Sequence, residues 1–511
     1  MSKSIESSVS ADTSSNLSEL KRKSVRGGLV TMSAQGITVG VQLTSTVVLA
    51  RLLSPEDYGT LAMVTAVTSF AALFRDLGLS SAAIQKQGLS NAQQSNLFWL
   101  NVLMGFALTA IVAGASPLVA RFYNKPDLVG VTLLLSLNFI FISMSTQHAA
   151  MLIKRMQFVR HSSATIIGAL ASLAVSVSLA FNGFGYWALA WGMLTGSLVR
   201  SILMFIFSPF MPRLPSRGSG IRELVGFGVN VTAFNFVNYF SRNLDNILIG
   251  KFIGAEALGL YNRAYQLMMF PITNLKGPIH SVGFPALSQL QARPDEFRLY
   301  ARKIIGIIAA LSMPLVVFLA VCSEWIIPLA LGPGWDKSVA IFVILSFTAF
   351  FQPVGSIRGQ VMLSMGNSNR YFRWGVANSL FVSVSFFLGL RWGVQGIAIA
   401  YGVCNTVILY PSLRYAFKDS PVCVRDFFES IARPALTSIA SGCFVLFKNV
   451  MWTMEPERAL GRVFGDSLVF GLVYLGLNSL SREGRQELYY IPTLIIHRIK
   501  IIKNRRSSSH V

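Results

Sequence analysis

The sequence predicts an all-α polytopic membrane protein with about 14 transmembrane helices. Of its 511 residues, 53% are hydrophobic and only 13% are charged, which is about half the charged share of a soluble domain. Runs of about 20 apolar residues recur along the chain, and each is long enough to cross a bilayer as a helix. Helices are expected because lipid offers no partner to backbone polar groups, which must therefore bond within their own segment.

The predicted spans follow one another with short connections between them. They lie near residues 28–50, 59–79, 97–118, 127–148, 162–182, 185–207, 223–250, 258–282, 302–323, 338–362, 371–390, 392–413, 430–452 and 462–480. No connection is long enough to fold as a domain of its own.

The net charge of +22 could reflect nucleic-acid binding, an anionic ligand or membrane topology. With a cytoplasmic N-terminus, the cytoplasmic connections and tails hold about 29 of the Lys and Arg residues, the opposite connections about 9, and the spans about 6. This asymmetry follows the positive-inside rule and places both termini in the cytoplasm. No polar domain with clustered basic and aromatic residues is present, so we expect no nucleic-acid partner.

No motif of a catalytic or metal site stands out. The four cysteines are scattered, without a CxxC pair or metal-ligand spacing to the five histidines, so we expect no metal, cofactor or catalytic residue. The motifs GxxxxGK[ST], HExxH and GxSxG are absent. A membrane-bound polysaccharide polymerase or ligase is the enzyme alternative, and the short connections disfavour it.

An internal repeat links the stretches RLLSPEDYG (51–59) and KFIGAEALG (251–259). At an offset of 200 residues the matched pairs are Leu49 and Ile249, Arg51 and Lys251, Leu53 and Ile253, Glu56 and Glu256, and Gly59 and Gly259. Each stretch is interpreted as the turn that opens a helical hairpin, with an acid where a helix begins. This chemistry favours a turn over a binding site.

A second repeated block supports the first. GFGYWALAWG (183–192) matches GVQGIAIAYG (393–402) at an offset of 210. The chain is therefore predicted to hold two parallel, pseudo-symmetric lobes of six helices, followed by two extra helices. The predicted parts are a polar tail (1–27), an N-lobe (28–207), a cytoplasmic linker (208–222), a C-lobe (223–416), the two extra helices (417–480) and a basic tail (481–511).

The first helix of each lobe carries a polar stripe. Polar residues recur at spacings of three and four, which place them on one helix face. They are Asn235, Asn238, Arg242 and Asp245 in the C-lobe, and Gln35, Thr38, Gln42 and Ser45 in the N-lobe. Lipid would not tolerate such stripes, so we expect them to face a central cleft.

Ionisable residues inside the spans add further candidates, since such residues usually mark a pathway. They are Arg75, Asp76, Arg242, Asp245, Arg263, Lys276 and Arg358. Basic residues outnumber acids, which favours an anionic substrate, and Arg forks suit phosphate oxygens. The alternatives are a structural pair of Arg242 with Asp245 and snorkelling of Arg75, Arg200 and Arg263 to the interface.

We therefore predict a set of substrate-binding residues and two acids of separate role. The predicted substrate ligands are Arg75, Arg242, Lys276, Arg358, Gln35, Thr38, Gln42, Asn235 and Asn238. Asp76 and Asp245 are predicted to serve in ion coupling or in structural ion pairs.

Taken together, five stretches resemble the polysaccharide flippases of the multidrug/oligosaccharidyl-lipid/polysaccharide exporter superfamily, and most of all its colanic-acid and exopolysaccharide exporters. They are RLLSPEDYG (51–59), RDLGLSSAAIQ (75–85), LFWLN (97–101), ARFYNKPDL (120–128) and ALGLYNRAYQL (257–267). The resemblance covers nearly all of residues 20–480.

The resemblance implies a bacterial inner-membrane transporter that flips an undecaprenyl-diphosphate-linked oligosaccharide by alternating access of two lobes. It implies partners in that lipid-linked substrate, in membrane lipids, and in a polysaccharide polymerase and export machinery. A multidrug exporter of the same superfamily is an alternative, but its cationic substrates would require acids in the cleft. A lipid II-type exporter is a further alternative, because it also handles a lipid diphosphate.

Overall fold

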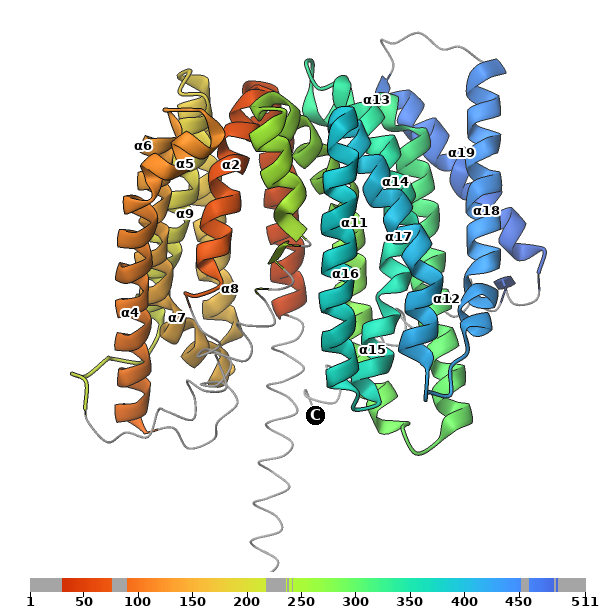
Figure 1. The fold of residues 1–511 in the computed structure, drawn as a ribbon, viewed down its shortest axis with the longest axis horizontal. Coiled ribbons are helices and arrows are strands. Elements are labelled where there is room, and N and C mark those ends of the chain that lie inside the picture. The colour runs from red at the N-terminus through yellow and green to blue at the C-terminus, as the bar shows by residue number, and fades with distance from the viewer. Residues whose placement is uncertain are drawn as a thin grey trace, which may run out of the picture. The chain divides into compact units, whose positions relative to one another are not determined.

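A computed structural model describes residues 30–75, 90–216, 236, 239–240, 242–451, 459–481 and 484–485. These residues form helices joined by short connections, and no strand occurs among them. The chain divides into two compact units, residues 1–259 and 260–511 (Figure 1).

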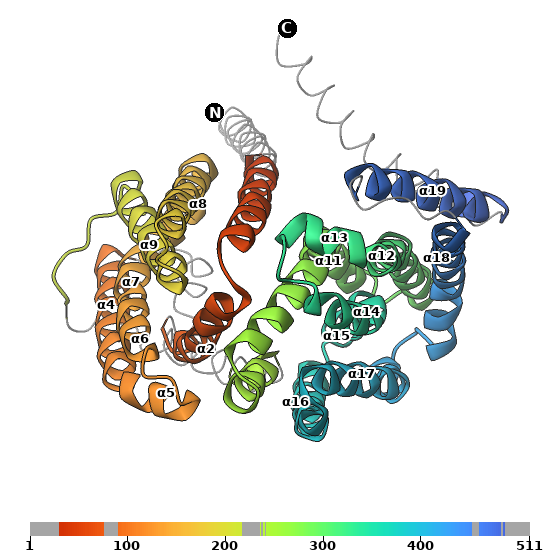
Figure 2. The ribbon, with the colours of Figure 1, turned by 90° about the horizontal axis from the view of Figure 1, so that it is seen from above.

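The first unit contains a helix over residues 30–52 and a series of longer and shorter helices after it. These are α2 (Pro55–Ala72), α4 (Asn91–Gly114), α5 (Ser116–Tyr123), α6 (Leu128–Ser136), α7 (Asn138–Lys154), α8 (Phe158–Phe181) and α9 (Tyr186–Phe207). Residues 242–252 are helical as well, and α11 (Ala255–Gln289) begins in this unit. Helix α9 packs against α8, α7, α6 and α2 (Figure 2).

The second unit consists of the rest of α11 and the helices that follow it. These are α12 (Pro294–Val321), α13 (Ser323–Leu331), α14 (Lys337–Gly355), α15 (Ile357–Ser364), α16 (Ser368–Gly389), the short 3₁₀ helix η1 (Leu390–Trp392), α17 (Gly393–Phe417), α18 (Val424–Met451) and α19 (Ala459–Ser479). Helix α12 packs against α18 and α14, and α17 packs against α16 and α14.

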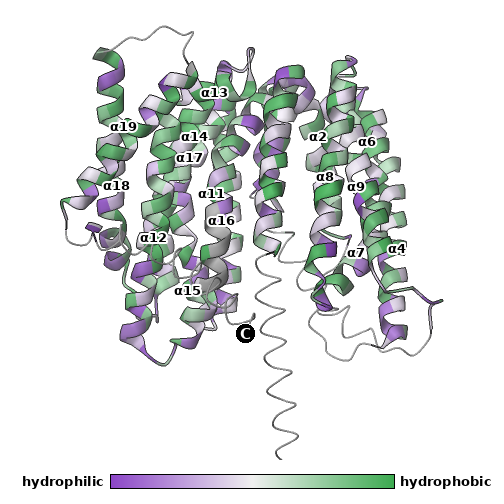
Figure 3. Ribbon diagram, turned by 180° about the vertical axis from the view of Figure 1, so that it is seen from behind, coloured by the Kyte–Doolittle hydropathy of each residue, from purple (hydrophilic) through white to green (hydrophobic). Residues whose placement is uncertain are grey.

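Within the described residues, nine helical segments are long and apolar enough to cross a membrane. They coincide with predicted spans three to six and nine to fourteen, since one segment, 368–417, holds two predicted spans. Hydrophobic residues cover α4 and α8 along most of their length, and hydrophilic residues gather at the helix ends (Figure 3). The chain is a multi-pass membrane protein, as the composition predicts.

The remaining predicted spans are more polar. Residues 30–52, α2 and α11 are helical where the first, second and eighth spans are predicted, but they are not among the strongly apolar segments. Most of the seventh span lies outside the described residues. The count of about 14 spans therefore stays a prediction.

The order of helices repeats along the chain. In the series α4 to α9, a long helix is followed by a short helix, then by a helix broken in its middle (α6 and α7), and then by two long helices. The series α12 to α17 has the same order, with α14 and α15 as the broken helix. The breaks fall at Leu137 in the first series and at Ser356 in the second. The matched glycines Gly183 and Gly393 both have a positive φ, of 77° and 70°. The internal repeat inferred from the sequence is thus visible in the helix order.

The two repeated turns pack against each other within the first unit. A Cβ atom added to Gly59 would lie 1.7 Å from the carbonyl oxygen of Ala255, and one added to Gly259 would lie 1.8 Å from the carbonyl oxygen of Pro55. Ala255 is the counterpart of Pro55 at the offset of 200 residues. The contact is therefore reciprocal, and only glycine permits so close an approach of backbone to backbone.

Asp57, whose counterpart in the second turn is Ala257, has a capping role in the first repeated turn. Its carboxylate accepts hydrogen bonds from the backbone N–H and the hydroxyl of Ser54, at 2.9 and 2.7 Å, and so completes a capping box at the start of α2. Its other oxygen accepts the backbone N–H of Tyr186, the first residue of α9, at 2.9 Å. One carboxylate thus caps two helices, which supports the interpretation of this motif as a turn.

Two buried acids hold helices of the second unit together. Asp426 in α18 accepts two hydrogen bonds from Arg298 of α12, at 2.8 and 2.9 Å. Asp466 in α19 is fully buried and forms an ion pair with Lys448 of α18. Because a buried charge is costly without a partner, these contacts are decisive for how the last two helices pack.

Candidate functional site

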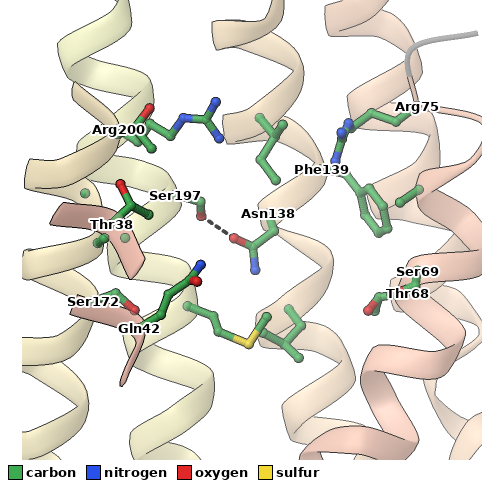
Figure 4. A pocket seen from close by; sticks show the side chains of 18 residues that line it. Thr38, Gln42, Thr68, Ser69, Arg75, Asn138, Phe139, Ser172, Ser197 and Arg200 are labelled. Carbon is green, nitrogen blue, oxygen red and sulfur yellow. Dashed lines mark hydrogen bonds between the residues drawn. The ribbon is translucent and has the colours of Figure 1, made fainter. Parts of the chain in front are cut away.

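A cavity of about 600 Å³ lies inside the first unit. It is lined by the helix over residues 30–52 and by α2, α6, α7, α8 and α9 (Figure 4). The lining residues are Thr38, Gln42, Thr68, Ser69, Ala72, Arg75, Leu135, Asn138, Phe139, Ile142, Thr165, Gly168, Ala169, Ser172, Met193, Gly196, Ser197 and Arg200. A cavity of this size matches the usual range for small-molecule sites.

Neutral polar groups form much of the wall. Hydroxyls and amides come from five helices and include those of Thr38, Gln42, Thr68, Asn138 and Ser197. The hydroxyl of Ser197 donates a hydrogen bond to the side-chain oxygen of Asn138 (Figure 4). Asn138 is the first residue of α7, directly after the break at Leu137. Side chains of this kind suit hydroxyl-rich ligands, because they both donate and accept hydrogen bonds.

Among the lining residues that the structure describes, two arginines carry the only charges. Arg75 follows the C-terminal end of α2, and Arg200 lies in the last two turns of α9. In Figure 4 both guanidinium groups point into the cavity at the same end of it. Arg200 makes no hydrogen bond or ion pair with any residue that the structure describes, and its Nε atom is buried. No Asp or Glu occurs in the described part of this lining.

Arg200 reaches the cavity because α8 and α9 approach closely. A Cβ atom on Gly168 would lie 2.9 Å from the Cβ of Arg200, and one on Gly196 would lie 2.8 Å from the Cβ of Ser172. Small residues at spacings of four allow such backbone approach between membrane helices. The packing thus fixes the base of the arginine, while its guanidinium remains on the cavity.

The chemistry of this cavity is that of an anion site with a neutral polar wall. A guanidinium stays protonated in proteins, so both arginines carry a permanent positive charge. In a low-dielectric setting this charge attracts an anion much more strongly than in water. Among the described residues, no group of His, Cys, Asp and Glu side chains is arranged to hold a metal ion.

The structure brings three of the predicted site residues together. Thr38, Gln42 and Arg75 line the same cavity, and their role in substrate binding stays a prediction. Gln35 is exposed and lies outside the lining.

The other candidates lie elsewhere or cannot be placed. Asn235, Asn238 and Asp76 fall outside the described residues, and Lys276 lies in α11 without a described side chain. Arg242 is exposed, whereas Asp245 is only 7% exposed.

Arg358 has a separate environment in the second unit. Its guanidinium donates hydrogen bonds to the carbonyl oxygen of Gly355, at 2.7 Å, and to the hydroxyl of Ser412 in α17. The first contact joins α15 to α14, and the second joins α15 to α17. A role of Arg358 in substrate binding stays a prediction.

The cavity also includes residues that the polar stripes do not indicate. Arg200, Asn138, Ser172 and Ser197 come from helices whose sequences are largely apolar. The signal for Arg200 is its place in the series Gly192, Gly196, Arg200, where the small residues at spacings of four indicate a tightly packed face.

Comparison with known proteins agrees with this architecture. A family model described as "Polysaccharide biosynthesis protein" matches residues 48–340. The lipopolysaccharide biosynthesis protein WzxC of Escherichia coli is 26% identical over 401 residues, covering 76% of this chain and 81% of WzxC. The teichuronic acid biosynthesis protein TuaB of Bacillus subtilis is 27% identical over 449 residues, covering 84% of this chain and 90% of TuaB.

Solved structures share the fold. The lipid II flippase MurJ in an inward closed conformation superposes with a TM-score of 0.72 at 15% identity, covering 88% of this chain and 98% of MurJ. An inward-facing multidrug resistance transporter of the MATE family gives a TM-score of 0.60 at 15% identity, covering 76% of this chain and 97% of that transporter.

Proposed function

The chain belongs to the polysaccharide biosynthesis protein family, and we propose that it flips an undecaprenyl-diphosphate-linked oligosaccharide across the bacterial inner membrane. The flipped lipid-linked sugar then serves polysaccharide export. The chain acts as a transporter, and its relatives carry the names of polysaccharide biosynthesis and transport proteins, such as the succinoglycan biosynthesis transport protein ExoT of Rhizobium meliloti.

The observation that carries this proposal is the pair of arginines on a cavity whose described lining residues include no acid. A diphosphate offers several anionic oxygens, and a guanidinium binds them through two parallel N–H donors. Each charge-assisted bond of this kind contributes about 1.5–3 kcal/mol. The guanidinium of Arg200 can donate such bonds to a ligand, because it makes no hydrogen bond or ion pair with a described residue.

The neutral wall supports a sugar next to the diphosphate. Hydroxyl and amide side chains such as Thr38, Asn138 and Ser197 lie beside the arginines (Figure 4). They can exchange hydrogen bonds with sugar hydroxyls in both directions. The prenyl chain, which is as apolar as the bilayer, stays in the lipid.

Transport by this scheme requires alternating access of the two lobes, as in other transporters built from repeats. The N- and C-termini lie in the cytoplasm, in accordance with the distribution of Lys and Arg. The polymerase and the export machinery that use the flipped product are the proposed partners of the chain.

A multidrug exporter is the second candidate, because the fold is shared with a MATE transporter. A cationic drug would meet two arginines and no carboxylate among the described residues of this cavity, and like charges repel strongly in a site of low dielectric. A lipid II-type substrate fits the arginines equally well, and its different sugar is the distinguishing feature.

Binding measurements on the purified protein separate a diphosphate-linked sugar from a cationic drug as the substrate. We expect a short-chain polyprenyl-diphosphate sugar to bind, and to bind about tenfold more weakly to Arg200→Gln. The same glycolipid without its diphosphate, and a cationic drug, should not bind in the same range. Arg121→Gln, which changes an exposed arginine outside the cavity, is the matched control. Equal affinity of wild type and Arg200→Gln for the diphosphate would contradict the proposal.

A further inference from the structure

The segment that follows α9 has an unusual repeat. Residues 208–216 read SPFMPRLPS and are neither helix nor strand. Proline recurs at every third position, at Pro209, Pro212 and Pro215, and Ser208 has φ −82° and ψ 130°. This spacing and geometry are typical of a polyproline II helix, which has three residues per turn. We call residues 208–216 the strap.

One face of the strap is bound to the first turns of α4. The backbone N–H of Arg213 donates to the hydroxyl of Ser95 at 3.0 Å, and its carbonyl accepts from the indole N–H of Trp99 at 2.8 Å. Three residues later, Ser216 exchanges two hydrogen bonds with the amide of Asn96, at 2.9 and 2.6 Å. The strap is thus held at intervals of one polyproline turn.

The same face buries an aromatic ring at its start. Phe210 is 5% exposed and belongs to one apolar cluster with Phe98, Val102 and Met151. Its ring also lies 5.5 Å from that of His148. Phe210, Arg213 and Ser216 are three residues apart, so they lie on one side of a polyproline helix.

The strap has few free backbone donors. Three of its residues are proline and carry no N–H group. Ser208 donates to the carbonyl of Met204, Phe210 to the hydroxyl of Ser208, and Arg213 and Ser216 to side chains of α4. A non-helical segment can therefore lie at the headgroup level at low cost, because most of its donors are absent or bonded and its remaining backbone groups can reach interfacial water.

A second face is apolar and exposed. Met211 is 69% exposed and Leu214, three residues later, is 82% exposed. Arg213 lies between them in the sequence and on the face bound to α4, but it is exposed, and its side chain makes no hydrogen bond or ion pair with a described residue. Two apolar side chains beside a cationic one form the pattern of an interfacial membrane anchor.

The position of the strap identifies what covers this face. It begins directly after α9 and is bound to the first turns of α4, and both helices are apolar enough to span a membrane. Figures 1 and 2 both show the segment on the outer side of the first unit, beyond α4. The strap therefore lies where the hydrocarbon of the bilayer meets its headgroups.

We propose that the strap is a lipid-binding element that lies in the headgroup region beside α4. Met211 and Leu214 enter the upper part of the acyl chains, and Arg213 binds a lipid phosphate. The strap sets the depth at which the first unit sits in the bilayer at this end of its helices. It acts independently of the substrate cavity and does not rest on the proposed function.

Fluorescence quenching in liposomes tests this proposal. In a background without the four native cysteines, a polarity-sensitive dye is attached at Met211→Cys and Leu214→Cys. Phospholipids brominated near the headgroup end of the acyl chain should quench both positions, and do so more strongly than lipids brominated near the chain end. Leu103→Cys, exposed in the middle of α4, calibrates the deep position, and Asp295→Cys, exposed at the start of α12, calibrates the aqueous one.

The contribution of the arginine is measured in the same preparation. With Arg213→Gln, quenching at position 214 should fall in liposomes that contain anionic lipid. Quenching by aqueous iodide at positions 211 and 214, with no quenching by brominated lipid, would overturn the proposal. Protection from iodide in cell membranes but not in liposomes would also overturn it, because it would assign the strap to a protein partner.

Discussion

Gly59 and Gly259 occupy matching positions in the two repeated turns, and each packs against the backbone of the other turn. The added Cβ of Gly259 would lie 1.8 Å from the carbonyl oxygen of Pro55 and 3.0 Å from the backbone nitrogen of Gly59 itself. A backbone atom cannot move aside as a flexible side chain can. This reciprocal contact explains why both repeated turns carry a glycine at the matching position, since any side chain there would collide with the backbone of the other turn.

Gly59→Ala and Gly259→Ala should each reduce the yield of folded protein severely. Overpacking typically costs about 1–3 kcal/mol, and a contact with rigid backbone lies at or beyond the upper end of that range. Size-exclusion profiles and thermal unfolding of the detergent-solubilised protein measure the effect. Gly40→Ala is the matched control, because a Cβ there would meet nothing within 4 Å. A Gly59→Ala variant as stable as Gly40→Ala would refute the reciprocal contact.

Asp57→Ala should lower the free energy of unfolding by about 1.5–3 kcal/mol, because it removes hydrogen bonds of a charged acceptor at the starts of α2 and α9. The neighbouring acid provides the control. Glu56 forms an ion pair of 2.5 Å with Lys125, but its side chain is 60% exposed, so Glu56→Gln should cost less than about 1 kcal/mol. Equal losses in the two variants would exclude the double cap.

Asp466→Asn should destabilise the last two helices by about 3–5 kcal/mol, because it leaves Lys448 without its buried partner. The amide of Asn449, which donates to Asp466 at 3.0 Å, also loses a charged acceptor. The double variant Lys448→Met/Asp466→Leu should recover most of the loss, since no charge then remains buried. Thermal unfolding of the three proteins is the measurement, and a double variant no better than Asp466→Asn would exclude the ion pair as the cause.

Cysteines at positions 38 and 42 should react with a water-soluble thiol reagent, and inorganic pyrophosphate should slow that reaction. Both positions line the cavity, and an anion held by the arginines would cover them. Leu43→Cys, on the same helix but outside the lining, should react slowly and independently of pyrophosphate. Labelling of positions 38, 42 and 43 at the same rate would contradict this prediction, because the reagent would then reach position 43 as readily as the two positions that line the cavity.

Much of the fold follows from simple patterns in the sequence. Hydropathy predicts α4 and α12, because each is an apolar segment long enough to cross the hydrocarbon of a bilayer as a helix. The offset of 200 residues identifies Gly59 and Gly259 as counterparts. Their contact with each other could not be predicted, since it depends on how two hairpins cross in space.

The site is only partly predictable for a related reason. The polar stripe indicates Thr38 and Gln42, because polar residues on a membrane helix must avoid lipid. Arg200 and Asn138 lie on helices without such a stripe, and only the packing of α8 on α9 and the break before α7 bring them to the cavity. Lys448 and Asp466 likewise pair across a connection that separates two helices, which no local pattern specifies.

The most direct test of the account is the flipping rate of a short-chain polyprenyl-diphosphate oligosaccharide in proteoliposomes. We expect Arg200→Gln and Arg75→Gln to lower this rate about ten- to a hundredfold each, with folded protein retained, while Arg121→Gln leaves it unchanged. Arg200→Lys should restore only part of the rate, because an ammonium lacks the planar fork. A double variant Arg75→Gln/Arg200→Gln that flips the lipid at the wild-type rate would contradict the central claim that these two arginines bind the diphosphate.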